Sequence, residues 1–313
     1  MKRILLKQFL KTAFFIIFST VMAQEREAIV GKWDLTVQME NFEVPSWLEV
    51  RKSGVETLVG YFLEYNGSAR PISQVHFDAG VVDFTIPPQW NGKSNVHLSA
   101  RLIGDQLIGT IMGNEAKAYS FVGVRAPQLN RVMPMGWSKP MVLFSGKDLK
   151  GWKPQFENKK NQWVAENGIL KSAQSGNNIM TEEKFEDFKL HVEVRYPEGS
   201  NSGIYLRGRY EVQIEDNHGK EPSSVLFGGI YGFLTPNEMA ALPAGEWQTF
   251  DITLVGRRVT VVANGKKIIT DQIIPGITGG AIDSHEADAG PILLQGDHGP
   301  IEYRNISIQI PEN

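Results

Sequence analysis

The chain contains no cysteine at any of its 313 positions. This absence excludes disulfide bonds, thiolate metal ligands and a cysteine nucleophile. It also excludes lipid attachment through a cysteine that follows a signal sequence. A protein without disulfides depends on ordinary hydrophobic cores, and this length is sufficient to form them.

Dense basic clusters and long internal apolar runs are also missing. The sequence has 32 Lys and Arg against 35 Asp and Glu, for a formal net charge of −3. Without a basic stripe, nucleic acid is not an expected partner. Beyond the first 24 residues, no apolar run approaches the ~20 residues of a membrane-spanning helix, so we expect no integral membrane span after signal removal.

The first 23 residues have the pattern of a secretory signal. Four basic side chains precede an apolar run over Thr12–Met22, and small residues before Gln24 fit a cleavage site. Cleavage would leave 28 Lys and Arg against 35 Asp and Glu, a net charge near −7. The pattern predicts a periplasmic or secreted protein, and the alternative is a retained membrane anchor.

Helical periodicity is nearly absent from the rest of the chain. One helical turn is predicted over residues 236–242, with Thr235 as its cap and Pro236 at its first position. Elsewhere, short β-rich runs alternate with turn dipeptides. Residues 259–263 and 266–270 flank Asn264-Gly265, which predicts a hairpin with a two-residue turn. The pattern therefore predicts an all-β protein made of sandwiches or barrels.

Composition divides the chain into two predicted domains. Residues 127–140 contain three prolines and few strand formers, which indicates a linker. Residues 25–126 before it form a small all-β accessory domain. Its Gly31-Lys32-Trp33 opening and strand spacing resemble barrels of the lipocalin type, and an open β-sandwich is the alternative. Residues 141–313 form the second domain.

The segment 199–218, GSNSGIYLRGRYEVQIEDNH, concentrates polar chemistry on strand faces. Strand side chains alternate, so Glu211, Gln213 and Glu215 share one face and apolar residues occupy the other. By the same alternation, Tyr205 and Arg207 share a face in the preceding run. Carboxylates, an amide, an arginine and a tyrosine are the donors and acceptors that a sugar requires. The alternative is an ordinary solvated strand.

From Leu143 onward, the sequence resembles the 3-keto-disaccharide hydrolase family over about residues 141–311. The motifs that resemble this family are, in order, LFSGKDLKGW (143–152), WVAENGIL (163–170), FKLHVEVR (188–195), NSGIYLRG with YEVQI (201–214), GEWQ (245–248) and LLQGDHGPIEYRNI (293–306). Two departures are Ser145, where Asn is common, and Gly296, which lengthens the closing motif and could shift His298 relative to Gln295. The resemblance implies a concanavalin-like sandwich of two antiparallel sheets and activity on glycosides with a ketone at carbon 3.

The spacing of carboxylates disfavours an ordinary glycosidase built on one strand. Such enzymes place two carboxyl groups about 5–5.5 Å or about 6.5–9.5 Å apart. Glu211 and Glu215 are four residues apart, which is roughly 13 Å along a strand. A carboxylate on another strand could still complete a pair. A 3-keto sugar needs no such pair, because its ketone acidifies the hydrogen on carbon 2 and permits elimination of the aglycone, followed by hydration.

Three residues are the catalytic candidates for that reaction. His298 titrates near neutrality and is a candidate base or acid, with a plain turn histidine as the alternative. Glu211 is the second acid–base candidate, and the alternative is a structural ion pair with Arg207 or Arg209. Arg207 is the candidate that holds the enolate or ketone oxygen. The substrate-binding candidates are Tyr205, Gln213, Glu215, Asp216 and Gln295.

No cofactor follows from the sequence with certainty. A divalent cation among Glu211, His218 and His298 would stabilise an enolate, yet no HxxxH or HxH spacing indicates a metal site. The leading hypothesis is an exported enzyme that cleaves 3-keto-glycosides, with an oxidised glycoside as its partner. A noncatalytic carbohydrate-binding protein and a conventional glycosidase are the alternatives.

Overall fold

The structure is a computed structural model that describes residues 26–90, 92–113 and 117–312. The predicted signal sequence lies outside these residues. No helix in the described part of the chain is long and apolar enough to cross a membrane. The contacts between residues divide the chain into two units. The first contains the residues up to Phe62 and Arg70–Ala126, and the second contains Leu63–Ala69 and the residues from Pro127 onward.

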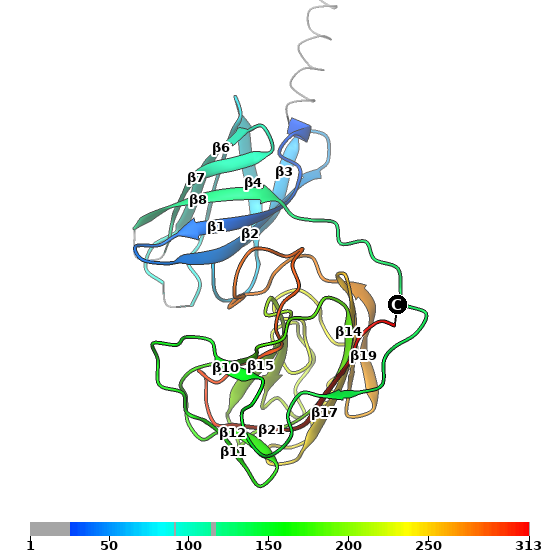
Figure 1. Cartoon of the computed structure of the whole chain (residues 1–313). Coiled ribbons are helices and arrows are strands. Elements are labelled where there is room, and N and C mark those ends of the chain that lie inside the picture. The colour runs from blue at the N-terminus through cyan, green and yellow to red at the C-terminus, as the bar shows by residue number, and fades with distance from the viewer. Residues whose placement is uncertain (1–25, 91, 114–116, 313) are drawn as a thin grey trace, which may run out of the picture. The chain divides into compact units, whose positions relative to one another are not determined.

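The first unit is a closed barrel in which each strand pairs with the next and the last pairs with the first (Figure 1). Its strands are β1 (Gly31–Gln38), β2 (Glu43–Ser53), β3 (Thr57–Leu63), β4 (Arg70–Asp78), β5 (Val81–Ile86), β6 (Val96–Ile103), β7 (Gln106–Met112) and β8 (Ala118–Arg125). Alternate side chains point inward and form one hydrophobic core, which includes Trp33, Phe62 and Phe84. Of the two architectures expected for this region, the structure has the barrel.

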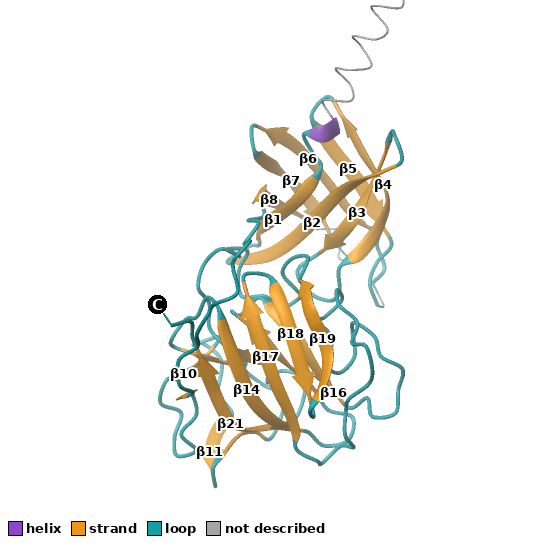
Figure 2. Cartoon of the chain, turned by 90° about the vertical axis from the view of Figure 1, so that its right-hand side faces the viewer, coloured by secondary structure: helices purple, strands orange, loops and turns teal. Residues whose placement is uncertain are grey.

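The second unit contains two antiparallel sheets. Its strands are β9 (Met141–Val142), β10 (Trp152–Pro154), β11 (Trp163–Glu166), β12 (Ile169–Ser172), β13 (Ile179–Thr181), β14 (Phe188–Arg195), β15 (Asn201–Leu206), β16 (Tyr210–Glu215), β17 (Gln248–Val255), β18 (Arg258–Ala263), β19 (Lys266–Ile273), β20 (Leu293–Leu294) and β21 (Ile301–Gln309). The smaller sheet has the order β10-β13-β20-β15-β16. The larger has the order β11-β12-β21-β14-β17-β18-β19, of which β21, β14, β17, β18 and β19 are seen side by side in Figure 2. Strand β9 pairs with β21 outside this order. The predicted two-sheet sandwich is confirmed.

One hydrogen bond identifies which face of the smaller sheet lies against the larger one. The Ser202 hydroxyl on β15 lies 2.8 Å from the Tyr303 hydroxyl on β21, so the two sheets meet at this pair. Even-numbered residues of β15 therefore face the sandwich core, where Ile204 is fully buried. Odd-numbered residues project from the opposite face, because strand side chains alternate.

Of the two local structures that the sequence predicted, the hairpin at Asn264-Gly265 is confirmed and the helical turn at 236–242 is wrong. Asn264 and Gly265 both have positive φ, at 51° and 77°, and they join β18 to β19 in the predicted hairpin. The expected helical turn at 236–242 does not form. Its backbone bonds to the hairpin instead: Asn237 N donates to Ile268 O at 2.8 Å, and Asn264 Nδ2 donates to Ala240 O.

Candidate functional site

The hairpin of β15 and β16 places Tyr205 and Glu211 side by side on the face that points away from the core. The two residues are direct partners in the register. Glu211 N donates to Thr278 Oγ1 at 2.9 Å, away from β15, so the pair is of the non-hydrogen-bonded kind in which side chains approach closely. Only 4% of Glu211 and 2% of Tyr205 is exposed, so the alternative of an ordinary solvated strand is wrong.

Gly203 makes room for the Glu211 carboxyl. A Cβ at this glycine would lie 2.4 Å from Glu211 Oε1 and 2.9 Å from Glu211 Cγ. Its φ is not among the positive ones, so the requirement for glycine is one of space. The carboxyl therefore lies over the backbone of the neighbouring strand in a position that any larger residue would block.

Burial changes the acidity of this carboxyl. It raises the pKa of Glu211 from 4.5 to about 8, against the lowering influence of the Tyr205 hydroxyl and of His298, and Asp297 raises it further. The Tyr205 hydroxyl donates to Gly279 O at 2.9 Å, which fixes its position beside the carboxyl. Glu211 is therefore mainly protonated at neutral pH and titrates near it.

The segment after β20 brings the closing motif to the same face. Gln295 N donates to Gly203 O at 2.9 Å, which continues the pairing of β20 with β15. The Gln295 Oε1 atom is buried and has no hydrogen-bond partner in the described structure. Gly296 N donates to Asn178 Oδ1 at 2.7 Å, so the extra glycine is held in place. Gln295 therefore presents a free acceptor near Glu211.

His298 lies close enough to influence Glu211 electrostatically. Its Nδ1 is 2.6 Å from Asp297 Oδ1, and about half of its side chain is exposed. The hydrogen bond with Asp297 raises the pKa of His298 above 6.5, and the charge of Glu211 contributes in the same direction. The imidazole is therefore biased towards its protonated form next to a carboxyl that is biased towards neutrality.

The other predicted substrate-binding residues have different surroundings. Gln213 shares the face of Glu211, but its Oε1 accepts from Ile214 N at 3.1 Å. Glu215 lies at the far end of β16, opposite Asn201. Asp216 follows the strand and accepts from Gly199 N at 3.1 Å, as an ordinary turn residue does. Gln213 thus lies near Glu211, whereas Glu215 and Asp216 are two or more residues further along.

The expectation that Arg207 shares a face with Tyr205 is wrong. Strand β15 ends at Leu206, and Arg207 is a turn residue with φ of 53°, so the alternation of side chains stops before it. The guanidinium is fully buried and donates through Nη2 to the Tyr210 hydroxyl and to Gly256 O, both at 2.9 Å. Tyr210 in turn donates to Glu286. Arg207 therefore belongs to a buried polar network on the core side of the sheet.

Tyr231 is a neighbour of Glu211 that sequence analysis did not identify. Val212 pairs with Ile230 in an isolated antiparallel bridge, and Tyr231 N donates to Glu211 O at 3.0 Å. This register places Tyr231 opposite Glu211 and on the same face. The residue comes from the loop GGIYGF, which has no strand periodicity, so no pattern in the sequence could have indicated its position.

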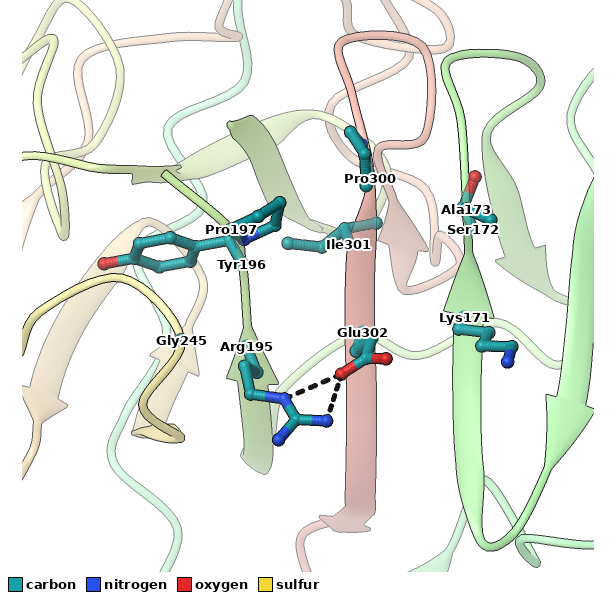
Figure 3. Close-up of a pocket in the computed structure, with 10 residues that line it drawn as sticks. All are labelled: Lys171, Ser172, Ala173, Arg195, Tyr196, Pro197, Gly245, Pro300, Ile301 and Glu302. Carbon is teal, nitrogen blue, oxygen red and sulfur yellow. Dashed lines mark hydrogen bonds and ion pairs between the residues drawn. The ribbon is translucent and has the colours of Figure 1, made fainter. Parts of the chain in front are cut away.

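No group of three or more His, Asp or Glu side chains is arranged to hold a metal ion in the ranges 26–90, 92–113 and 117–312. His218 Nδ1 lies 2.7 Å from Ala241 O, which places it in another environment from His298. A separate cavity of about 410 Å³ is shown in Figure 3. Arg195 on β14 and Glu302 on β21 form an ion pair of 2.6 Å in its wall. It contains none of the residues around Glu211.

Comparison with known proteins identifies the family of the second unit. Residues 139–309 match a family described as the 3-keto-alpha-glucoside-1,2-lyase-like domain. The chain belongs to this family. The match spans the whole sandwich that contains Glu211 and His298, and it leaves out the barrel. The resemblance seen in the sequence motifs is thereby confirmed.

Individual proteins are similar to this chain at moderate identity. A 3-keto-disaccharide hydrolase of Bacteroides thetaiotaomicron (strain ATCC 29148) is 25% identical over 194 residues, which is 50% of this chain and 67% of that protein. Two crystal structures from Parabacteroides distasonis ATCC 8503 are each described as a "putative glycosyl hydrolase". One is 31% identical with a TM-score of 0.48, covering 55% of this chain and 84% of that one. The other is 26% identical with a TM-score of 0.45, covering 55% and 100%.

Proposed function

We propose that this protein cleaves 3-keto-α-glucosides by eliminating the aglycone, with hydration of the product to complete a net hydrolysis. The observation that supports this best is the Glu211 carboxyl, buried over Gly203, with its pKa raised to about 8 and with His298 beside it. A base whose pKa lies near the operating pH is suited to removing a carbon-bound proton. The family description and the name of the Bacteroides relative indicate the keto sugar.

The two titratable groups have complementary roles in this proposal. Glu211, in its ionised fraction, accepts the proton from carbon 2, and the electron pair moves into the carbonyl to form an enolate. The enolate collapses, the bond between carbon 1 and the glycosidic oxygen breaks, and protonated His298 donates its proton to that oxygen. Hydration reverses the roles: neutral His298 takes a proton from the attacking water, and Glu211 returns its proton to carbon 2.

A conventional glycosidase is the second candidate, favoured by one observation. Asp297 lies near enough to Glu211 to raise its pKa, so a carboxyl group from β16 and one from the segment between β20 and β21 approach each other. Glu211 would be the protonated acid and Asp297 the second carboxylate. However, Asp297 already forms a hydrogen bond with His298, and this engagement makes it less suited to attack a sugar or to activate water.

The deciding experiment compares two nitrophenyl α-glucosides, one with a ketone at carbon 3 and one unmodified, using the full chain in deuterated buffer. We expect release of nitrophenolate from the keto substrate only, with deuterium at carbon 2 of recovered substrate or product. Cleavage of the unmodified glucoside, lost in Asp297→Asn, would instead support the conventional glycosidase. Binding of both sugars without turnover would support a lectin-like role.

Substitutions separate the roles of the two groups. Glu211→Gln is expected to lower both carbon-2 exchange and turnover by about 10²–10⁴-fold. His298→Gln is expected to slow turnover of an alkyl keto-glucoside but not of the nitrophenyl one, because nitrophenolate leaves without an acid. The matched control is Glu238→Gln, which alters a half-exposed carboxylate paired with Lys266. Equal activity of Glu211→Gln and this control would overturn the proposal.

Export and domain organisation are part of the same proposal. We propose that residues 1–23 direct the protein to the periplasm or the cell exterior, and that residues 25–126 are an accessory domain joined by residues 127–140 to the catalytic domain 141–313. Mass spectrometry of the processed N-terminus checks the first point. Turnover by residues 127–313, compared with the full chain, checks the second.

A further inference from the structure

The row of residues across the smaller sheet at Glu211 shows which groups flank it. Leu293 on β20 pairs with Tyr205, Tyr205 pairs with Glu211, and Tyr231 lies opposite Glu211 on its other side. Because directly paired residues project from the same face, all four side chains line one face of the sheet. Glu211 is therefore flanked by two phenols.

The two phenols differ in what their hydroxyl groups contact. Tyr205 is 2% exposed, and its proton is directed at Gly279 O. Tyr231 is partly exposed, and its hydroxyl forms no hydrogen bond with any described residue. Burial and the nearby Glu211 and Glu215 raise the pKa of Tyr231, so its hydroxyl keeps its proton. Beside the base there is thus one phenol with an uncommitted donor.

The proposed reaction needs a hydrogen-bond donor for the negative charge that develops on the substrate. Removal of the carbon-2 proton places that charge on the oxygen of carbon 3, two bonds away from the carbon that loses its proton to Glu211. A donor directed at such an oxygen stabilises the transition state more than the ground state. Arg207, which the sequence suggested for this task, points into the core. The unpartnered Gln295 Oε1 is an acceptor and is suited to a sugar hydroxyl instead.

We infer that Tyr231 is a catalytic residue whose hydroxyl donates a hydrogen bond to the carbon-3 oxygen as the enolate forms. The phenol keeps its proton throughout. When the enolate collapses, the carbon-3 carbonyl re-forms, a double bond forms between carbon 1 and carbon 2, and the negative charge leaves with the glycosidic oxygen, which His298 protonates. This inference rests on the proposed function, since only a keto substrate generates that oxyanion. It adds a loop residue at 231 to a site otherwise built from strands and the closing motif.

The test is Tyr231→Phe, which removes only the hydroxyl. On the nitrophenyl 3-keto-glucoside we expect kcat to fall about 10²–10³-fold, the loss seen when one oxyanion donor is removed, with KM changed less than about threefold. The rate of deuterium exchange at carbon 2 should fall by the same factor, because the donor acts on enolate formation. A merely structural role for the hydroxyl would not change exchange and turnover in parallel.

Controls distinguish this inference from the function on which it rests. Tyr196→Phe removes a buried hydroxyl that has no hydrogen-bond partner among the described residues, on a tyrosine packed against Phe227, and should leave kcat unchanged. If the wild type acts on the keto substrate and Tyr231→Phe matches it, the inference is wrong and the proposed function stands. An increase in KM alone in Tyr231→Phe would show that the hydroxyl binds the ground state and the transition state equally, and would also overturn the inference. A wild type inactive on every keto-glucoside would remove both.

Discussion

The buried carboxyl of Glu211 should make the sandwich less stable as the pH rises. Its pKa is raised to about 8 in the folded chain, whereas an exposed glutamate has a value of 4.5. Between these two values, unfolding releases a proton that the folded state retains. The free energy of unfolding therefore decreases with increasing pH across this window. Glu211→Gln removes the titration while keeping the shape of the side chain.

The size of the effect follows from the same linkage. Each pH unit inside the window changes the free energy of unfolding by about 1.4 kcal/mol per proton. Between pH 5 and pH 7 the variant should therefore gain about 2–3 kcal/mol relative to the wild type. For a unit of this size that corresponds to roughly 5–10 °C in Tm. The activity of the wild type should increase with pH while its stability decreases, because the rate rises until Glu211 is ionised near pH 8.

Thermal unfolding of the wild type, Glu211→Gln and the surface control Glu238→Gln at half-unit intervals from pH 5 to pH 8.5 tests this reasoning. The quantity of interest is the difference in Tm between variant and wild type, because other titrating groups cancel in it. We expect the difference to widen with pH for Glu211→Gln and to stay flat for Glu238→Gln. A flat difference for both variants would show that Glu211 is ionised in the folded protein at neutral pH.

Two further substitutions probe the surroundings of the site. Gly203→Ala places a methyl group 2.4 Å from the position of the Glu211 carboxyl oxygen. We expect turnover to fall by at least about tenfold, while the far-ultraviolet circular dichroism spectrum is retained. Turnover at the wild-type rate would show that the carboxyl does not need this space. Glu286→Gln removes the buried carboxylate that Arg257 contacts, and we expect urea denaturation to show a loss of about 3–5 kcal/mol in the free energy of unfolding. A loss below about 1 kcal/mol would mean that the buried network is not held by its charges.

The side chains that share the face of Glu211 could be predicted only as far as the chain remains extended. Strand alternation correctly placed Glu211 and Gln213 on one face, because side-chain direction in a strand depends on sequence position alone. The same alternation failed at Arg207, where the backbone enters a turn with positive φ. Periodicity gives no information about side-chain direction beyond the last extended residue.

Loops that complete the site could not be predicted from local patterns. Tyr231 lies opposite Glu211 because a loop pairs with β16 through a bridge at Ile230, a contact between segments about twenty residues apart. The helical turn expected at Pro236 failed for the related reason that its backbone found hydrogen-bond partners on the hairpin of β18 and β19. In both cases tertiary contacts outweighed weak local preferences.

The sequence alone determined the all-β class, the hairpin at Asn264-Gly265, the family and the strand that contains Glu211. These depend on local periodicity, turn chemistry and the order of motifs, all of which are written in neighbouring residues. Only the tertiary structure decided that the Glu211 carboxyl is buried over Gly203, that Arg207 points into the core, and that Tyr231 and His298 lie near the carboxyl. The physical reason is that burial, and with it the acidity of a carboxyl, is set by residues that are distant in sequence and brought together by folding.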